Sequence, residues 1–187
     1  MTMVASKIGT IPTKGFEWYI ILLEGPFGDE IREQIDKYFL ELGKEAGPDV
    51  LAVRGYDATV FRDSFIESTS FYGRDDLKAK AVDSPAIVVT DALPEAVERR
   101  GGLDTAKVLI FPLRQIYEQH KDISVFFNQL LSALRAPEAM AALEKLDSTD
   151  IEKYWGWLTQ YIEMKPGFFG FKADLKKIIS VLLQKAR

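Results

Sequence analysis

The stretch Trp18-Tyr19-Ile20-Ile21-Leu22-Leu23 and the residues that follow it, Glu24-Gly25-Pro26-Phe27, decide the expected fold. Six consecutive apolar residues that end at a Gly-Pro pair are typical of a strand buried on both faces of a sheet. A helix is expected over 29–42, because its apolar side chains repeat at helical spacing and form one stripe. A buried strand that leads into an amphipathic helix favours the layered α/β class.

Shorter apolar runs after this unit predict three further strands, over 50–53, 86–90 and 108–111. Apolar residues at helical spacing predict helices between and after them, over 59–72 and 116–136. A short helix begun by Pro94 is expected in the link between the last two strands. The expected order is β-α-β-α-β-β-α, followed by about three helices.

The chain has 187 residues, a length that fits one domain with a helical annex. Residues 1–15 show no period and are expected to form a flexible arm. Residues 16–135 are expected to form the α/β domain. Residues 136–187 are expected to form a helical extension that packs on this domain or on a partner.

Cysteine is absent from the chain, and histidine occurs once. These counts exclude disulfides, thiolate metal ligands, cysteine nucleophiles and multi-histidine metal sites, so neither a metal nor a cofactor is expected. Lys and Arg number 24 against 28 for Asp and Glu, an acidic balance that argues against nucleic acid as a partner. No apolar run approaches the roughly 20 residues of a membrane-spanning helix, so a cytoplasmic protein without membrane contact is expected.

The element order and two local features resemble the thioredoxin-like fold. In that family a βαβ unit is followed by a helix, a ββ hairpin and a closing helix, and a Cys-Gly-Pro-Cys motif starts the first helix. Here Gly25-Pro26 stands at that place, with Glu24 and Phe27 where the cysteines would be. The family also has a cis-proline before its third strand, and Ser84-Pro85 takes this position. The resemblance implies a redox-inactive thioredoxin-like domain with candidate pocket residues in these two segments.

Two departures from the family pattern leave an alternative open. The stretch between the Gly-Pro loop and Pro85 is long, and so is the link from Thr90 to Lys107. An extra helix in that link could make a parallel crossover instead of a hairpin. The alternative fold is therefore another doubly wound α/β sheet.

Carboxylates are the remaining candidates for chemistry. Glu24 could act as a general base in a partly apolar pocket, since burial raises the pKa of a carboxyl group. It could equally end its strand in solvent. Asp57 and Asp91 follow two other predicted strands, so an enzyme that uses carboxylates alone is a further hypothesis. The single histidine, His120, lies among charged residues and is expected on a solvated helix face.

Aromatic residues are concentrated near the carboxyl end of the chain. Trp157 lies off the apolar stripe of its expected helix, and three phenylalanines fall in a glycine-bounded loop. Such side chains either pack into a core or form an interface, in which aromatic anchors dominate. The interface candidates are Trp155, Trp157, Tyr161, Phe168, Phe169 and Phe171.

The missing thiols and the aromatic cluster favour a non-catalytic thioredoxin-like module for protein interaction or assembly. Its partner would be another protein or a second copy of the chain. The alternative is a ligand-binding protein or enzyme that resembles glutathione transferases, which join a thioredoxin-like domain to a helical one. Those proteins activate glutathione with a Tyr, Ser or Cys near the start of the first helix, and residues 25–33 contain none of the three.

Overall fold

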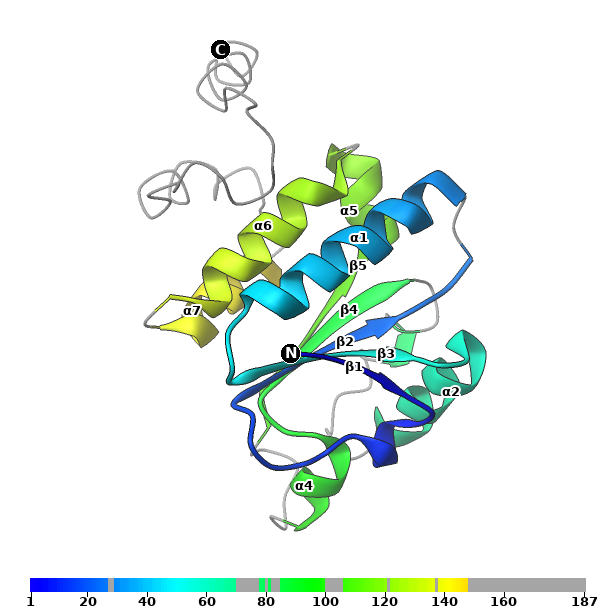
Figure 1. The fold of residues 1–187 in the computed structure, drawn as a ribbon, viewed down its shortest axis with the longest axis vertical. Coiled ribbons are helices and arrows are strands. Elements are labelled where there is room, and N and C mark those ends of the chain that lie inside the picture. Colours follow the sequence, from blue (N-terminus) through cyan, green and yellow to red (C-terminus); the bar gives the residue numbers. More distant parts are fainter. Residues whose placement is uncertain are drawn as a thin grey trace. The chain divides into compact units, whose positions relative to one another are not determined.

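The computed structural model describes most of the first 147 residues of the chain (Figure 1). The described ranges are 1–26, 29–69, 78–79, 81, 85–99, 106–120, 122–136 and 138–147. All of them belong to the first of two units into which the chain divides, Met1–Tyr154. The expected boundary at residue 135 falls inside this unit.

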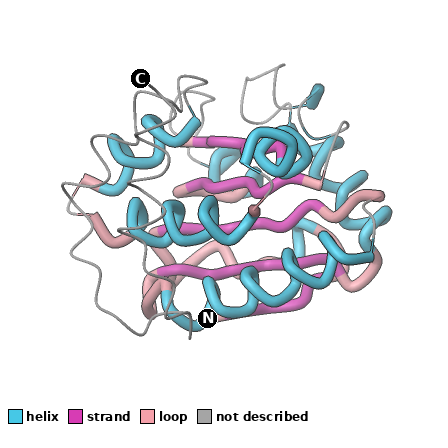
Figure 2. The backbone as a smooth tube through the Cα atoms, turned by 90° about the horizontal axis from the view of Figure 1, so that it is seen from above, coloured by secondary structure: helices cyan, strands magenta, loops and turns pink. Residues whose placement is uncertain are grey.

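The described residues form a mixed sheet of five strands, in the order β1-β3-β2-β4-β5 (Figure 1). Figure 2 shows the strands of this sheet in magenta between the helices. The strands are β1 (Thr2–Ala5), β2 (Trp18–Leu23), β3 (Val50–Gly55), β4 (Ala86–Thr90) and β5 (Val108–Pro112). β3 runs parallel to both of its neighbours, β1 and β2. β4 runs antiparallel to β2, and β5 runs antiparallel to β4. The α/β class predicted from the apolar runs is confirmed.

Helices cover both faces of this sheet (Figure 1). One face carries α1 (Asp29–Glu45), α5 (Leu113–His120), α6 (Ile123–Leu134) and α7 (Ala139–Asp147). The other face carries η1 (Ile8–Thr10), α2 (Ala58–Ser68) and α4 (Pro94–Arg99). Because both faces are covered, the strands consist mainly of apolar residues, as the unbroken run in β2 predicts.

Buried side chains fill the space between each helical layer and the sheet. On the α2 side, Phe61 and Phe65 pack against the odd-numbered residues of β2 in one continuous cluster. On the α1 side, the rings of Tyr38 and Phe127 stack at 6.0 Å between α1 and α6. Burial of each such side chain contributes about 1.5–3 kcal/mol to the stability of the fold. Trp18 is the one residue of β2 that is not fully buried.

The expected flexible arm over 1–15 is wrong, because this segment begins with a strand of the sheet. Thr2 to Ala5 form β1, which pairs in parallel with residues 52–55 of β3. A Cβ at Gly43 would lie 2.1 Å from Thr2 Oγ1, so glycine lets α1 approach β1 closely. Four residues are too few to show a clear period, and only pairing with β3 identifies them as a strand.

The single helix expected over 116–136 is two helices in the structure. Asp122 begins the second one, because its Oδ1 accepts a hydrogen bond from Ser124 N at 2.8 Å. Aspartate at this position satisfies a backbone donor that the first turn leaves unpaired. The apolar spacing continues across the break, so periodicity alone does not reveal it.

The link between β4 and β5 is a wide hairpin that contains α4. β5 pairs antiparallel with β4, so the parallel crossover considered from the sequence is wrong at this link. Two hydrogen bonds close its base. Asp91 N donates to Lys107 O at 3.3 Å, and Lys107 N donates to Asp91 Oδ1 at 2.7 Å. Within the described part of the chain, no helix is long and apolar enough to cross a membrane.

Candidate functional site

Residues 24–26, the described part of the predicted Gly-Pro loop, lie at the end of the sheet where β2 and β3 end. Open α/β sheets commonly bind ligands at the carboxyl ends of their parallel strands. Leu23 of β2 is paired with Ala86 of β4, so the flanking residues Glu24 and Pro85 take neighbouring positions at this edge. The structure therefore brings together the two segments that carry the resemblance.

Helix α5 is attached to both segments through its first residues. Leu113 N donates to Pro85 O at 2.9 Å, and Arg114 Nη2 donates to Pro26 O at 3.3 Å. Gly25 lies between Glu24 and Pro26 and is partly buried. Two other candidate residues, Phe27 and Ser84, lie outside the described residues. The Ser84–Pro85 peptide bond therefore also lies outside them.

Glu24 belongs to a group of four charged residues that we call the Glu24 cluster. Its Oε1 lies 2.7 Å from Arg54 Nη2, and its Oε2 lies 3.8 Å from Arg32 Nη2. Arg54 also reaches Asp36, with 3.0 Å between Nη1 and Oδ1. The Glu24 and Arg54 side chains are 14% and 22% exposed, so this pair is largely withdrawn from water. Glu24 is neither a solvated strand end nor an unpaired carboxylate.

The Glu24 cluster joins the neighbouring strands β2 and β3 to the helix α1, which covers them. Glu24 follows β2, Arg54 stands in β3, and Arg32 and Asp36 come one turn apart from α1. A guanidinium that serves two carboxylates fixes the positions of both, because its planar donors hold them in one geometry. The arrangement stabilises this edge of the fold and leaves Glu24 poorly placed to accept a proton from a substrate.

Three members of the cluster were not predicted as site residues. Arg54 is the only charged residue in a run of apolar strand residues, which was a visible sign of a specific partner. Arg32 and Asp36 looked like ordinary surface charges of an amphipathic helix. Their role depends on where α1 crosses β3, which no local pattern encodes.

The carboxylates of the further enzyme hypothesis do not converge. Asp57 caps α2, because its Oδ1 accepts a hydrogen bond from Val60 N at 2.9 Å. Asp91 closes the β4–β5 link. It follows β4, which runs antiparallel to β2, so it lies at the opposite end of these strands from Glu24. That hypothesis is therefore wrong for these residues. Among the residues that the structure describes, no three metal-binding side chains gather in one place.

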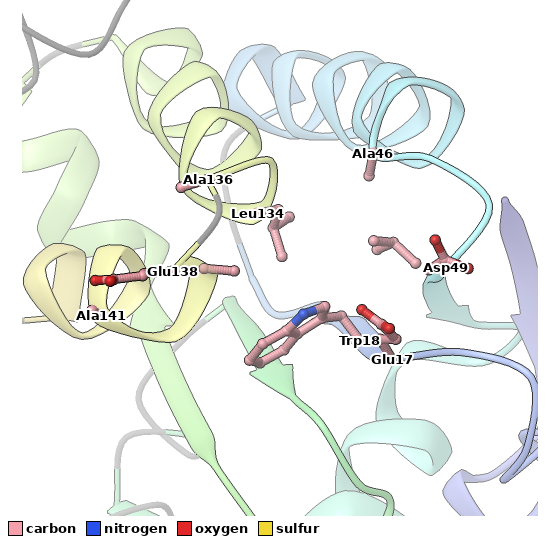
Figure 3. Close-up of a pocket in the computed structure, with 10 residues that line it drawn as sticks. Glu17, Trp18, Ala46, Asp49, Leu134, Ala136, Glu138 and Ala141 are labelled. Atoms are coloured by element: carbon pink, nitrogen blue, oxygen red, sulfur yellow. The ribbon is translucent and has the colours of Figure 1, made fainter.

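A cleft of about 570 Å³ lies at the other end of β2 and was not predicted (Figure 3). Trp18 lines it from the start of β2, and the far ends of α1 and α6 and the start of α7 form its other sides. We call it the Trp18 cleft. Its lining residues are Glu17, Trp18, Ala46, Asp49, Val50, Leu134, Ala136, Glu138, Ala139 and Ala141.

Local backbone geometry places two carboxylates beside Trp18. Gly47 has a positive φ of 98°, which allows the chain to turn sharply between α1 and β3. Glu17 N and Trp18 N then both donate to Asp49 O, at 2.8 and 3.2 Å. Residues 17 and 49 are consequently neighbours at the starts of parallel strands. Figure 3 shows their side chains on one side of the cleft.

The predicted aromatic interface cannot be placed relative to either region. Its residues Trp155, Trp157, Tyr161, Phe168, Phe169 and Phe171 lie outside the described residues. The side chain of His120, at the end of α5, is also outside the description.

Comparisons with known proteins add no relative to this picture. No family model matches the chain, and neither a curated protein nor a solved structure matches it. The function must therefore be argued from the geometry of the two ends of the sheet.

Proposed function

We propose that this protein is a non-catalytic thioredoxin-like module that binds another protein or a second copy of itself. The strand order supports a thioredoxin-like arrangement. β2, α1 and β3 form a parallel βαβ unit, α2 follows, β4 and β5 pair antiparallel, and helices close the domain. β1 adds an edge strand to this unit.

The observation that carries the binding function is a set of exposed apolar side chains around the carboxyl end of β3, which also holds Arg54 of the Glu24 cluster. Tyr56 directly follows β3 and is 87% exposed, and Val4 and Val60 are also exposed. The three are joined through the backbone, since Tyr56 N donates to Ala5 O and Asp57 caps the turn that carries Val60. Tyrosine is a frequent anchor in protein interfaces because its ring buries a large area at low entropic cost.

The nature of Glu24 supports the absence of redox chemistry at this edge. Thiol–disulfide exchange requires a thiolate, and the chain has no cysteine. The resemblance places a redox group where Glu24 stands, and here an ion pair with Arg54 occupies that position. A rigid, ion-paired edge with an exposed tyrosine beside it is suited to recognition by contact.

Site-specific photo-crosslinking in the source cell tests this proposal. A photoreactive phenylalanine at position 56 should give one defined crosslinked product, either with a partner or with a second copy. The same residue at the exposed Glu67 position of α2 is the matched control and should not give that product. In the purified complex, Tyr56→Ser should abolish association while the free energy of unfolding changes by no more than about 0.5 kcal/mol. Identical products from both positions would refute the proposed surface.

The alternative related to glutathione transferases makes a different prediction. Such a protein should be retained on immobilised glutathione and released by free glutathione. The segment before and at the start of α1 offers no hydroxyl or thiol to activate the ligand, since residues 25–33 contain no Tyr, Ser or Cys. We therefore favour the interaction module.

A further inference from the structure

We propose that the Trp18 cleft is a docking site for a basic side chain, arginine in particular, of a partner protein. This inference rests on the proposed function as a protein-binding module, and it names a second contact surface at the opposite end of the sheet. The cleft volume of about 570 Å³ falls within the range of pockets that hold small ligands or single side chains. The occupant follows from the lining.

One part of the cleft wall is apolar. Trp18 is only partly buried, although it starts a strand whose other residues are all buried. Its ring faces the buried side chain of Leu134 across the cleft, and alanines that follow α1 and α6 or belong to α7 complete the walls (Figure 3). A long side chain with an aliphatic stem could lie along this surface, as lysine and arginine commonly do.

Carboxylates lie on both sides of the apolar part, and the described residues that line the cleft include no Lys or Arg. Glu17 and Asp49 lie on one side next to Trp18. Glu138 lies on the opposite side, with its carboxylate pointing away from the tryptophan (Figure 3). Among the described residues, neither Glu17 nor Asp49 has a hydrogen-bond or ion-pair partner for its side chain. These two groups remain available to a cation that enters from solution.

Two cations that adjoin lining residues of the cleft are engaged with other groups. Arg135 binds the carbonyl group of Glu45 and lies 3.3 Å from its Oε2. The amino group of Met1 donates to the carbonyl oxygens of Gly43 and Val50. The described lining residues themselves carry three carboxylates, a charge that complements a basic partner.

Arginine matches the combination of groups better than other side chains. Its planar guanidinium stacks on an aromatic ring and donates to carboxylates in the same pose, whereas a neutral side chain could use only the apolar walls. The Trp18 ring and the Glu17 and Asp49 carboxylates supply these two kinds of contact on one side of the cleft.

The test is a titration of the full chain, followed by NMR of the tryptophan indole N–H groups. The probes are N-acetyl-arginine amide and its neutral isostere, N-acetyl-citrulline amide. Trp18→Phe identifies the Trp18 signal among the three tryptophans. We expect a saturable shift of the Trp18 signal with the arginine probe, at least about fivefold weaker binding of citrulline, and weakening by added salt.

A charge-matched pair of variants locates the interaction. Glu17→Gln with Asp49→Asn should weaken binding of the arginine probe about tenfold, since two charge-assisted contacts are lost. Asp63→Asn with Glu67→Gln removes the same charge from exposed positions of α2 and should leave binding within about twofold of the original.

Equal binding of arginine and citrulline probes, or equal loss in both double variants, would overturn the proposal. A saturable response to N-acetyl-leucine amide as strong as that to arginine would also overturn it, because the cleft would then accept apolar groups. None of these results affects the crosslinking at position 56. Failure of the cleft proposal can thus be told apart from failure of the proposed function.

Discussion

The two ends of β2 treat their acidic residues in opposite ways. At the carboxyl end, Glu24 is shielded from water and held by Arg54 and Arg32. At the amino end, Glu17 and Asp49 are exposed beside Trp18, without partners among the described residues. The six residues of the strand separate the two ends by about 20 Å. The comparison teaches that carboxylates at strand ends can serve stability at one edge and remain available for binding at the other.

Loss of Arg54 is the strongest test of this contrast. Arg54→Met should lower the free energy of unfolding by about 2–3 kcal/mol, because it leaves the shielded Glu24 with only the longer contact to the exposed Arg32. The loss stays below that for a fully buried pair, because Asp36 keeps contact with solvent. Urea unfolding followed by circular dichroism measures it.

A surface arginine provides the control for this measurement. Arg99 pairs with Glu95 at 3.5 Å on the exposed side of α4. Arg99→Met should change the free energy of unfolding by no more than about 0.5 kcal/mol. Equal losses for the two variants would remove the distinction between a structural cluster and ordinary surface charge.

A double-mutant cycle divides the cluster into its two pairs. We expect a coupling energy of about 1–2 kcal/mol between Glu24 and Arg54, and less than about 1 kcal/mol between Asp36 and Arg54. The first contact is shorter and its carboxylate is less exposed. The variants are Glu24→Gln, Asp36→Asn and Arg54→Met, alone and combined. A larger coupling for Asp36 would mean that α1, rather than the end of β2, is the main partner of Arg54.

The acidic residues of the cleft should contribute little to stability. Glu17→Gln with Asp49→Asn should change the free energy of unfolding by no more than about 0.5 kcal/mol, since no described partner loses a contact. A small gain is the expected direction, because two neighbouring like charges are removed. Urea unfolding of this variant beside Arg54→Met checks the contrast, and a loss above about 1 kcal/mol would assign the two carboxylates a structural role.

Redox conditions should have no effect at either end. The melting temperature should be the same with and without a reductant, because the chain has no thiol to oxidise. The pure protein should also fail to catalyse the reduction of insulin disulfides. Catalysis of that reaction would contradict the role assigned to the edge that holds Glu24.

The main elements could be predicted because their signals are local. The β2 run and the strand over 86–90 coincide with the observed strands. The helix expected over 29–42 begins at the expected residue and ends at Glu45, three residues later than expected. Apolar period and turn residues act within a few positions of one another, so they are visible in the sequence. The break between α5 and α6 was missed because Asp122 interrupts the helix without interrupting its apolar stripe.

The functional surfaces depend on contacts that no local pattern shows. Arg54 and Glu24 are 30 positions apart, and Arg135 and Glu45 are 90 apart. Which charges meet is decided by the register of β2 against β3 and by the place where α1 crosses them. The Trp18 cleft likewise exists only where the ends of α1 and α6 and the start of α7 meet the first residue of β2.

The sequence by itself determined the α/β class, the positions of four strands and the absence of thiol chemistry. These follow from residue types and short-range periodicity, which persist whatever the chain packs against. Only the tertiary structure decided that residues 2–5 form a strand and that β5 returns antiparallel. It also decided that Glu24 is ion-paired while Glu17 and Asp49 have no ion-pair partner among the described residues. Strand pairing and charge pairing bring distant residues together, and the free energy of those contacts depends on the packed fold rather than on any segment alone.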